Sequence, residues 1–274
     1  MSSIPHKTEN GNEIFDSATK FLKEFQVGKL LFQCNAGKTK GIPVMDIFRY
    51  LFCLIFSDRS MYMQRKTGAF EGGFCKNTVY RFLNNTKTNW QRFTTLLSAR
   101  IINDFMKPLT SDNRKDVFII DDSLFDRSRS CKTELLAKVF DHCSMKYKRG
   151  YRMLTLGWSD GNSFIPVNHC LLSASDDRNL LCEASSYDGR SLAGKRRRQS
   201  RRKATEVMLE LIHMAQKSGL SAKYVLFDSW FSSPKAVVAL KQEHGLDTIA
   251  MVKKSSKIKY GYQDGRFNIK EIYS

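Results

Sequence analysis

The sequence predicts an α/β fold, in which a mixed sheet of three antiparallel strands and two parallel strands follows an all-helical N-terminal region. Up to about Arg100, apolar residues recur at steps of three and four, which indicates amphipathic helices. After the polar linker 107–114 the pattern changes to short apolar runs bounded by turn residues, which indicates strands. The last two strands alternate with helical segments, and such crossovers join parallel strands.

The bulk composition limits the classes of partner and compartment. The chain has 274 residues and a net charge of +18, which predicts a polyanionic partner. Nucleic acid is the first choice, and an anionic membrane surface is the alternative. The seven cysteines are scattered without a C-x-x-C pair, which argues against a disulfide framework or zinc ribbon and for a reducing cytoplasm. The most apolar window, 44–56, is too short and too charged to cross a bilayer, so we expect no membrane segment.

The chain divides by composition into four parts. We expect a flexible leader at 1–12, a helical domain at 13–106, an α/β domain at 115–256, and a β-hairpin in the remaining residues 257–274.

The helical domain contains a pattern that fits a helix-turn-helix. A short helix over 75–83 and a longer helix from Trp90 flank a polar turn, and in a basic protein this pair is a candidate for DNA reading. Thr78, Tyr80 and Arg81 are then the side chains expected to be exposed. The alternative is a set of packed helices that only covers the second domain.

The sequence pattern of the second domain predicts a definite strand order. The first three strands form an antiparallel meander, and helical crossovers bring the fourth strand beside the first. A short helix is expected near Glu134, and the segment between the third strand and the next helix is expected to be a polar loop. The predicted strands are Val117–Asp121, Tyr151–Trp158, Phe164–Leu172, Tyr224–Asp228 and Thr248–Val252, and the helices after the third strand are Thr205–Lys217 and Pro234–His244.

Strands one and four both end in aspartate, so the carboxylates of Asp121 and Asp228 are expected to lie together at the carboxyl edge of the sheet. Two carboxylates that close repel one another unless a cation is present, and oxygen ligands on an open edge suit Mg²⁺ or Mn²⁺. Asp122 is a rival to Asp121, because alternation along the strand turns only one of them toward the metal. The position directly after the apolar run favours Asp121.

The blocks Ile119-Ile-Asp-Asp-Ser123 and Phe227-Asp-Ser-Trp-Phe231 resemble the first two acidic motifs of DDE transposases from bacterial insertion sequences. Three further segments resemble motifs of the same family: the turn at Asn84-Asn, the pair Asn89-Trp90 and the segment Gly157-Trp-Ser-Asp-Gly161. The resemblance covers roughly residues 40–274. It implies an RNase H-like fold, metal-dependent cleavage and transfer of double-stranded DNA at mobile-element ends, a homodimer, and a location at the nucleoid in the bacterial cytoplasm.

The resemblance also implies a third acid, a glutamate in a helical Tyr, Arg, Glu, Lys motif. Only Glu243 and Glu271 follow Asp228, and neither lies in that motif. In the subgroup with a long β-insertion this glutamate lies beyond the insertion, and residues 257–274 look like its start. The sequence therefore suggests a C-terminally truncated chain that is inactive alone.

Further residues are candidates for DNA contact. Seven of the nine residues in 195–203 are basic, which favours phosphate contact over base reading. Trp230 is a candidate for stacking on a base, whereas Phe231 is expected in the core. Two alternative functions stay open, a DNA-binding remnant without chemistry and an RNase H-like nuclease. The basic candidates are Lys195, Arg196, Arg197, Arg198, Arg201, Arg202 and Lys203.

Overall fold

The computed structural model describes residues 11–56, 60–68, 73–111, 113–252 and 255–273. It divides into two compact units, Met1–Phe93 and Thr94–Ser274. The division falls inside helix α6 (Trp90–Arg100), earlier in the chain than the linker predicted at 107–114. Among the described residues, no helix combines the length and apolarity needed to cross a membrane.

The first unit is helical, as predicted. Its apolar core is built from one face of each amphipathic helix and includes Leu22, Leu31 and Ile47, all nearly inaccessible to solvent. Helix α1 begins inside the predicted leader, of which residues 1–10 lie outside the described part. The helices are α1 (Gly11–Glu24), α2 (Val27–Gln33), α3 (Val44–Leu54), α4 (Met61–Lys66) and α5 (Lys76–Leu83).

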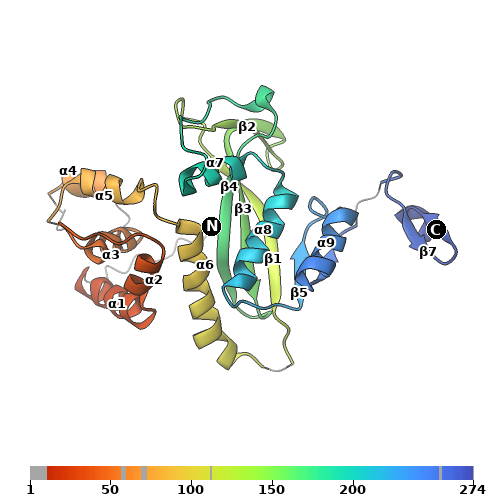
Figure 1. Cartoon of the computed structure of the whole chain (residues 1–274), viewed down its shortest axis with the longest axis horizontal. Coiled ribbons are helices and arrows are strands. Elements are labelled where there is room, and N and C mark those ends of the chain that lie inside the picture. The colour runs from red at the N-terminus through yellow and green to blue at the C-terminus, as the bar shows by residue number, and fades with distance from the viewer. Residues whose placement is uncertain (1–10, 57–59, 69–72, 112, 253–254, 274) are drawn as a thin grey trace. The chain divides into compact units, whose positions relative to one another are not determined.

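The second unit contains a six-stranded mixed sheet (Figure 1). Its main path runs in the order β2-β3-β1-β5-β6, and β4 also pairs with β3. Strands β2 and β4 share the edge of β3 that faces away from β1. Without β2, the order is the one expected for an RNase H-like sheet, so the predicted fold class is confirmed. The strands are β1 (Val117–Asp126), β2 (Ala137–Asp141), β3 (Lys146–Ser159), β4 (Phe164–Leu172), β5 (Tyr224–Phe227) and β6 (Asp247–Ala250).

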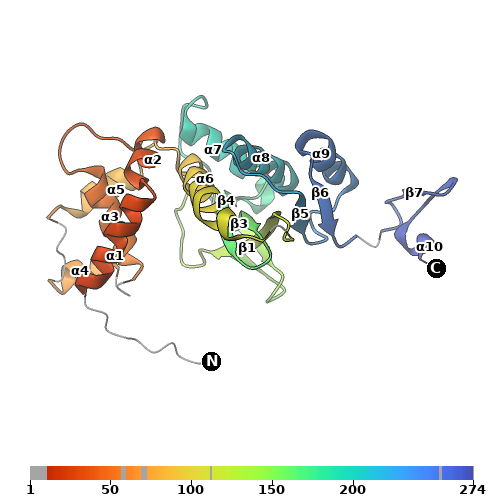
Figure 2. The same cartoon turned by 90° about the horizontal axis from the view of Figure 1, so that it is seen from below.

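One face of this sheet is the main core. Phe118 and Ile120 of β1 alternate onto it and lie opposite Trp158 and Leu156 of β3. Helices α8 (Ala204–Lys217) and α9 (Pro234–His244) contribute apolar side chains to the same cluster, and Figure 2 shows both helices on one side of the strands. These helices therefore fix the position of β5, which lies between them in the chain.

Three elements differ from the sequence-based expectation. Strand β1 continues five residues past Asp121, so this aspartate lies within the strand and not at its end. The segment expected to be a short helix near Glu134 instead contains strand β2, paired with the start of β3. The segment expected to be a polar loop contains helix α7 (Leu192–Ser200).

Short elements complete the second unit. A π-helical turn (Ile101–Met106) and a 3-10 turn (Lys107–Leu109) follow α6, and a second 3-10 turn (Asp177–Asn179) precedes α7. The predicted hairpin near the end of the chain is confirmed as β7 (Tyr260–Tyr262) and β8 (Gly265–Phe267), followed by the short helix α10 (Ile269–Ile272).

Candidate carboxylate edge and nucleic-acid interface

The two acid-bearing strands are parallel neighbours, as the sequence predicts. Strand β5 pairs with β1 from Val117 to Ile119, in register with Tyr224 to Leu226. Beyond that pairing β1 continues alone on this side, while the chain leaves β5 after Phe227. Asp121, Asp122 and Asp228 therefore follow the same three paired positions at the carboxyl edge of the sheet.

Asp121 is exposed on the sheet face opposite the main core. Its Oδ1 accepts a hydrogen bond from the backbone amide of Asp122 at 2.8 Å. In the described part of the chain no ion pair to Asp121 is found. Its carboxylate is thus available to solvent or to a cation.

Asp122 lies on the other face, in line with Phe118 and Ile120, and its side chain is only 18% exposed. It forms an ion pair with the guanidinium of Arg152 on β3. The same guanidinium lies over the ring of Trp230, 5.2 Å from its centroid. Arg152 therefore connects Asp122 to the turn that follows β5.

Asp228 stands in that turn and is exposed. Its Oδ1 accepts a hydrogen bond from the backbone amide of Trp230 at 2.8 Å, an Asx-turn that takes the chain out of the strand. Strand alternation consequently does not extend to Asp228, so it does not decide which of Asp121 and Asp122 lies on the side of Asp228. The contacts through Arg152 favour Asp122 as the partner of Asp228.

The donors at this edge fit a hard divalent cation, since carboxylate oxygens are the ligands that Mg²⁺ and Mn²⁺ prefer. Within the described residues, however, no group of three or more potential metal ligands forms. Glu243 is exposed on α9. The carboxylate of Glu271 accepts the Asn268 backbone amide at 2.7 Å and closes a capping box on α10. Neither glutamate completes the site.

Arg152 is a site residue that the sequence reasoning missed. The available signal was a charged side chain in the mostly apolar predicted strand Tyr151–Trp158, between Tyr151 and Met153. Such a charge is retained in a sheet when a carboxylate compensates it, as Asp122 does here.

The basic run 195–203 separates into two groups. Three arginines form ion pairs with acids of the same chain: Arg197 with Glu134 at 2.6 Å, Arg201 with Asp177 at 2.6 Å, and Arg202 with Glu210 at 2.8 Å and Glu206 at 3.3 Å. The other four basic side chains are exposed, and no ion pair to them is found among the described residues. The second group, Lys195, Arg196, Arg198 and Lys203, is therefore the part of the run best suited to contact phosphates.

Helix α5 presents a polar face in the first unit. Tyr80 is 52% exposed and Arg81 is exposed, together with Asn77 and Asn84. Thr78 is different, because its side chain is buried and its hydroxyl lies 3.5 Å from the sulfur of Cys75. The expectation that Thr78 is exposed to DNA is wrong, since its step along the helix turns it inward with Val79 and Phe82.

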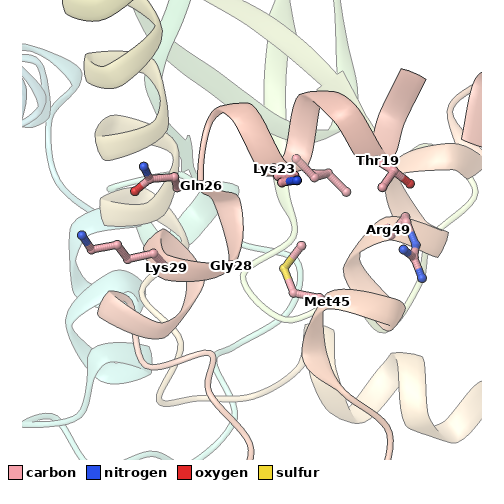
Figure 3. A pocket seen from close by; sticks show the side chains of 8 residues that line it. Thr19, Lys23, Gln26, Gly28, Lys29, Met45 and Arg49 are labelled. Atoms are coloured by element: carbon pink, nitrogen blue, oxygen red, sulfur yellow. The ribbon is translucent and has the colours of Figure 1, made fainter. Parts of the chain in front are cut away.

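A cationic hollow lies between α1, α2 and α3 (Figure 3). It has a volume of about 290 Å³, and Lys23, Lys29 and Arg49 line it. Arg49 is paired with Asp46 at 3.0 Å. Gly28 lets the helices approach, because a Cβ there would lie 3.1 Å from the sulfur of Met45. Sequence reasoning missed this hollow because its residues come from three separate helices.

Comparisons with known proteins give one family match and a weak structural likeness. A search of curated proteins finds no match. Among solved structures, the crystal structure of the Mos1 mariner paired end complex with Mn is 11% identical, with 93% of this chain and 80% of that chain covered and a TM-score of 0.24. A likeness that weak bears on neither the fold nor the site. The family model described as DDE superfamily endonuclease matches residues 56–264, and the chain belongs to that family.

Proposed function

We propose that this protein is a transposase that cleaves and transfers strands of double-stranded DNA at the ends of an insertion sequence. One observation carries the proposal within the DDE superfamily endonuclease family: the parallel pairing of β1 with β5, which leaves Asp122 and Asp228 at one edge of the sheet. In sheets of this kind ligands bind at the carboxyl edge.

Asp122 and Asp228 are the residues that would hold Mg²⁺ or Mn²⁺, with Asp121 as the rival to Asp122. A bound divalent cation supplies activation of water and stabilisation of the leaving oxygen in phosphodiester cleavage. The ion pair between Arg152 and Asp122 compensates the carboxylate at Oδ2 without a metal, and a cation bound at that oxygen would open this pair. Opening it also frees the Arg152 guanidinium for a phosphate oxygen.

The DNA duplex is proposed to contact both units. In the second unit the exposed basic side chains Lys195, Arg196, Arg198 and Lys203 suit the phosphate backbone. In the first unit Tyr80 and Arg81 of α5 present the polar face that suits a groove. A homodimer is part of the proposal, because two element ends have to be held together during strand transfer.

Nicking of a plasmid that carries the element ends, in Mn²⁺, tests the catalytic assignment. Asp122→Ala and Asp228→Ala should each lower the nicking rate at least about 100-fold, and each should weaken Mn²⁺ binding, followed by electron paramagnetic resonance, about tenfold or more. Glu243→Gln is the matched control, because this exposed acid lies on α9 outside the edge. If Asp121→Ala abolished both readouts and Asp122→Ala left them intact, the partner of Asp228 would be Asp121.

A second function, DNA binding without cleavage, is favoured by one specific observation. The edge carries Asp122 within β1 and Asp228 directly after β5, and in the described part of the chain no group of three potential metal ligands forms. This reading predicts salt-sensitive gel shifts of element-end DNA in EDTA and no nicking by residues 1–274 in Mn²⁺. Offering an RNA–DNA hybrid in the same assay distinguishes an RNase H-like nuclease, which would cut the hybrid in preference to the duplex.

A further inference from the structure

Four aromatic side chains from two separate segments form a continuous row, here named the aromatic strip: Tyr147, Phe140, His142 and Trp230. Phe140 and Tyr147 are paired across β2 and β3 with ring centroids 5.3 Å apart. Phe140 and His142 are 5.0 Å apart, and His142 and Trp230 are 5.7 Å apart. Because Trp230 belongs to the turn that begins at Asp228, the strip leads to the carboxylate edge.

The hairpin that carries three of these rings is held by Asp141. Its carboxylate accepts hydrogen bonds from the ammonium of Lys148 at 2.7 Å, the hydroxyl of Ser144 at 2.6 Å and the amide of Cys143 at 3.1 Å. The bond from Lys148, followed by that from Ser144, holds the pKa of Asp141 well below its usual range. The turn is therefore ordered at neutral pH, and the rings are positioned before any ligand arrives.

The strip is open to solvent. Tyr147 is 67% exposed, Trp230 is 48% exposed and His142 is also exposed. Rings that serve only the core are buried, as Phe231 is beside them. A row in which three of the four rings are exposed, next to the carboxylate edge, is typical of a binding surface.

The charges around the strip select the ligand. Arg152 lies over the Trp230 ring, and Lys138, Lys146 and Arg149 on the hairpin strands are exposed. Rings interleaved with cations suit a nucleic-acid strand, whose bases stack on the rings while its phosphates meet the cations. In a duplex the base faces are already stacked on one another, so only unpaired bases can use the strip.

We propose that the aromatic strip binds unpaired bases of a DNA strand and directs that strand toward Asp228. This proposal deepens the function proposed above and rests on it for the role of the edge. Binding itself needs neither metal nor cleavage, so it can be measured when both are absent.

The test is fluorescence anisotropy of the full chain in EDTA with labelled oligo-dT, a blunt duplex of equal length and oligo-rU. The wild-type protein should bind oligo-dT through the strip, and more tightly than it binds oligo-rU. Tyr147→Ala and Trp230→Ala should each weaken oligo-dT binding about tenfold, the size expected for loss of one stacked base, while duplex binding changes less than twofold. Phe164→Ala is the matched control, because this exposed ring pairs with Ser159 at the far end of β3 from Tyr147 and should have no effect.

A second readout keeps the test valid if an alanine variant folds poorly. Among the three tryptophans, Trp158 is fully buried and Trp230 is 48% exposed. Oligo-dT should therefore quench tryptophan fluorescence, and Trp230→Phe should abolish the quench while it keeps the affinity within about twofold, because a ring remains.

Unchanged oligo-dT affinity in both alanine variants, or equal losses for duplex and single strand, would overturn the proposal. Tighter binding of oligo-rU than of oligo-dT would overturn the assignment to DNA. If Asp228→Ala lost nicking but kept its oligo-dT binding, the proposal for the strip would be supported. The loss of nicking would then bear only on the carboxylate edge.

Discussion

Two pairs of aspartates in the second unit look alike in the sequence but differ in the structure. Asp141 and Asp160 are nearly buried and accept several hydrogen bonds within a turn. Asp121 and Asp228 are exposed, and each accepts one hydrogen bond from a backbone amide one or two residues further along. Asp122 lies between the two pairs, since it is half-buried and compensated by Arg152. The first pair stabilises turns, and the others retain oxygen atoms for a ligand.

Asp160 gives a pH-dependent prediction at this scale. The amides of Ser163 and Asn162 and the hydroxyl of Thr110 donate to its carboxylate, and they lower its pKa to about 2 against the cost of burial. A depressed folded-state pKa stabilises the fold above the unfolded-state value, near 4, and this contribution is lost as the pH falls toward 2. Asp160→Asn should therefore cost about 2 kcal/mol in urea unfolding at pH 6 and clearly less at pH 3. Equal costs at both values would contradict the assignment.

Single residues also show how far sequence reasoning reaches. The apolar runs before Asp121 and Asp228 predicted their strands correctly, because a short apolar run before a turn is compatible with few structures other than a buried strand. The choice between Asp121 and Asp122 depends on a contact with Arg152, thirty residues away from Asp122, which no local pattern encodes. For Thr78, a polar side chain in a basic helix looked exposed, but its hydroxyl is accommodated inside by Cys75.

The elements that the sequence did not predict lack a periodic apolar pattern. Helix α7 has six polar or charged residues after Leu192, Ala193 and Gly194, and the Ser191 hydroxyl caps its start by accepting the Gly194 amide. Its inner side is polar as well, since Arg197 is compensated by Glu134. Strand β2 has only five residues, too few to show alternation against a background of helix-forming leucines. Tertiary contacts decide both elements.

Gly150 provides a prediction for the junction of three strands. It pairs with Asp126 of β1 on one side and with Ala137 of β2 on the other. A Cβ at this position would overlap the carbonyl oxygen of Phe125, which is backbone and cannot rotate away. Gly150→Ala should lower the free energy of unfolding by about 2 kcal/mol or more, measured by urea denaturation. Gly261→Ala is the matched control, because nothing lies within 4 Å of a Cβ there, and it should change stability by less than about 0.5 kcal/mol.

At the scale of the whole molecule, the net positive charge bears on the attraction to DNA. The chain has 45 lysines and arginines against 27 acids, which leaves +18. Some of the 45 cations are compensated within the fold, in pairs such as Arg197 with Glu134 and Arg201 with Asp177, each of which also occupies one of the 27 acids. The attraction to DNA should therefore come from the exposed, uncompensated cations and not from the total count.

The salt dependence of DNA binding measures this difference. Each phosphate contact that is lost lowers the slope of log affinity against log salt by about 0.9. The triple variant Lys195→Ala, Arg198→Ala and Lys203→Ala should thus lower the slope by about 2 to 3, since these side chains are exposed. Arg201→Ala is the control within the same run, because Asp177 and the carbonyl of Ser175 already hold its guanidinium, and its slope should stay within about 0.5 of the wild-type value. Anisotropy titrations with a 20-base-pair duplex between 50 and 200 mM salt, about the range over which such slopes are resolved, give both numbers. A slope lowered by about 0.9 in Arg201→Ala would mean that the ion pair of Arg201 opens on DNA and that this side chain also contacts a phosphate.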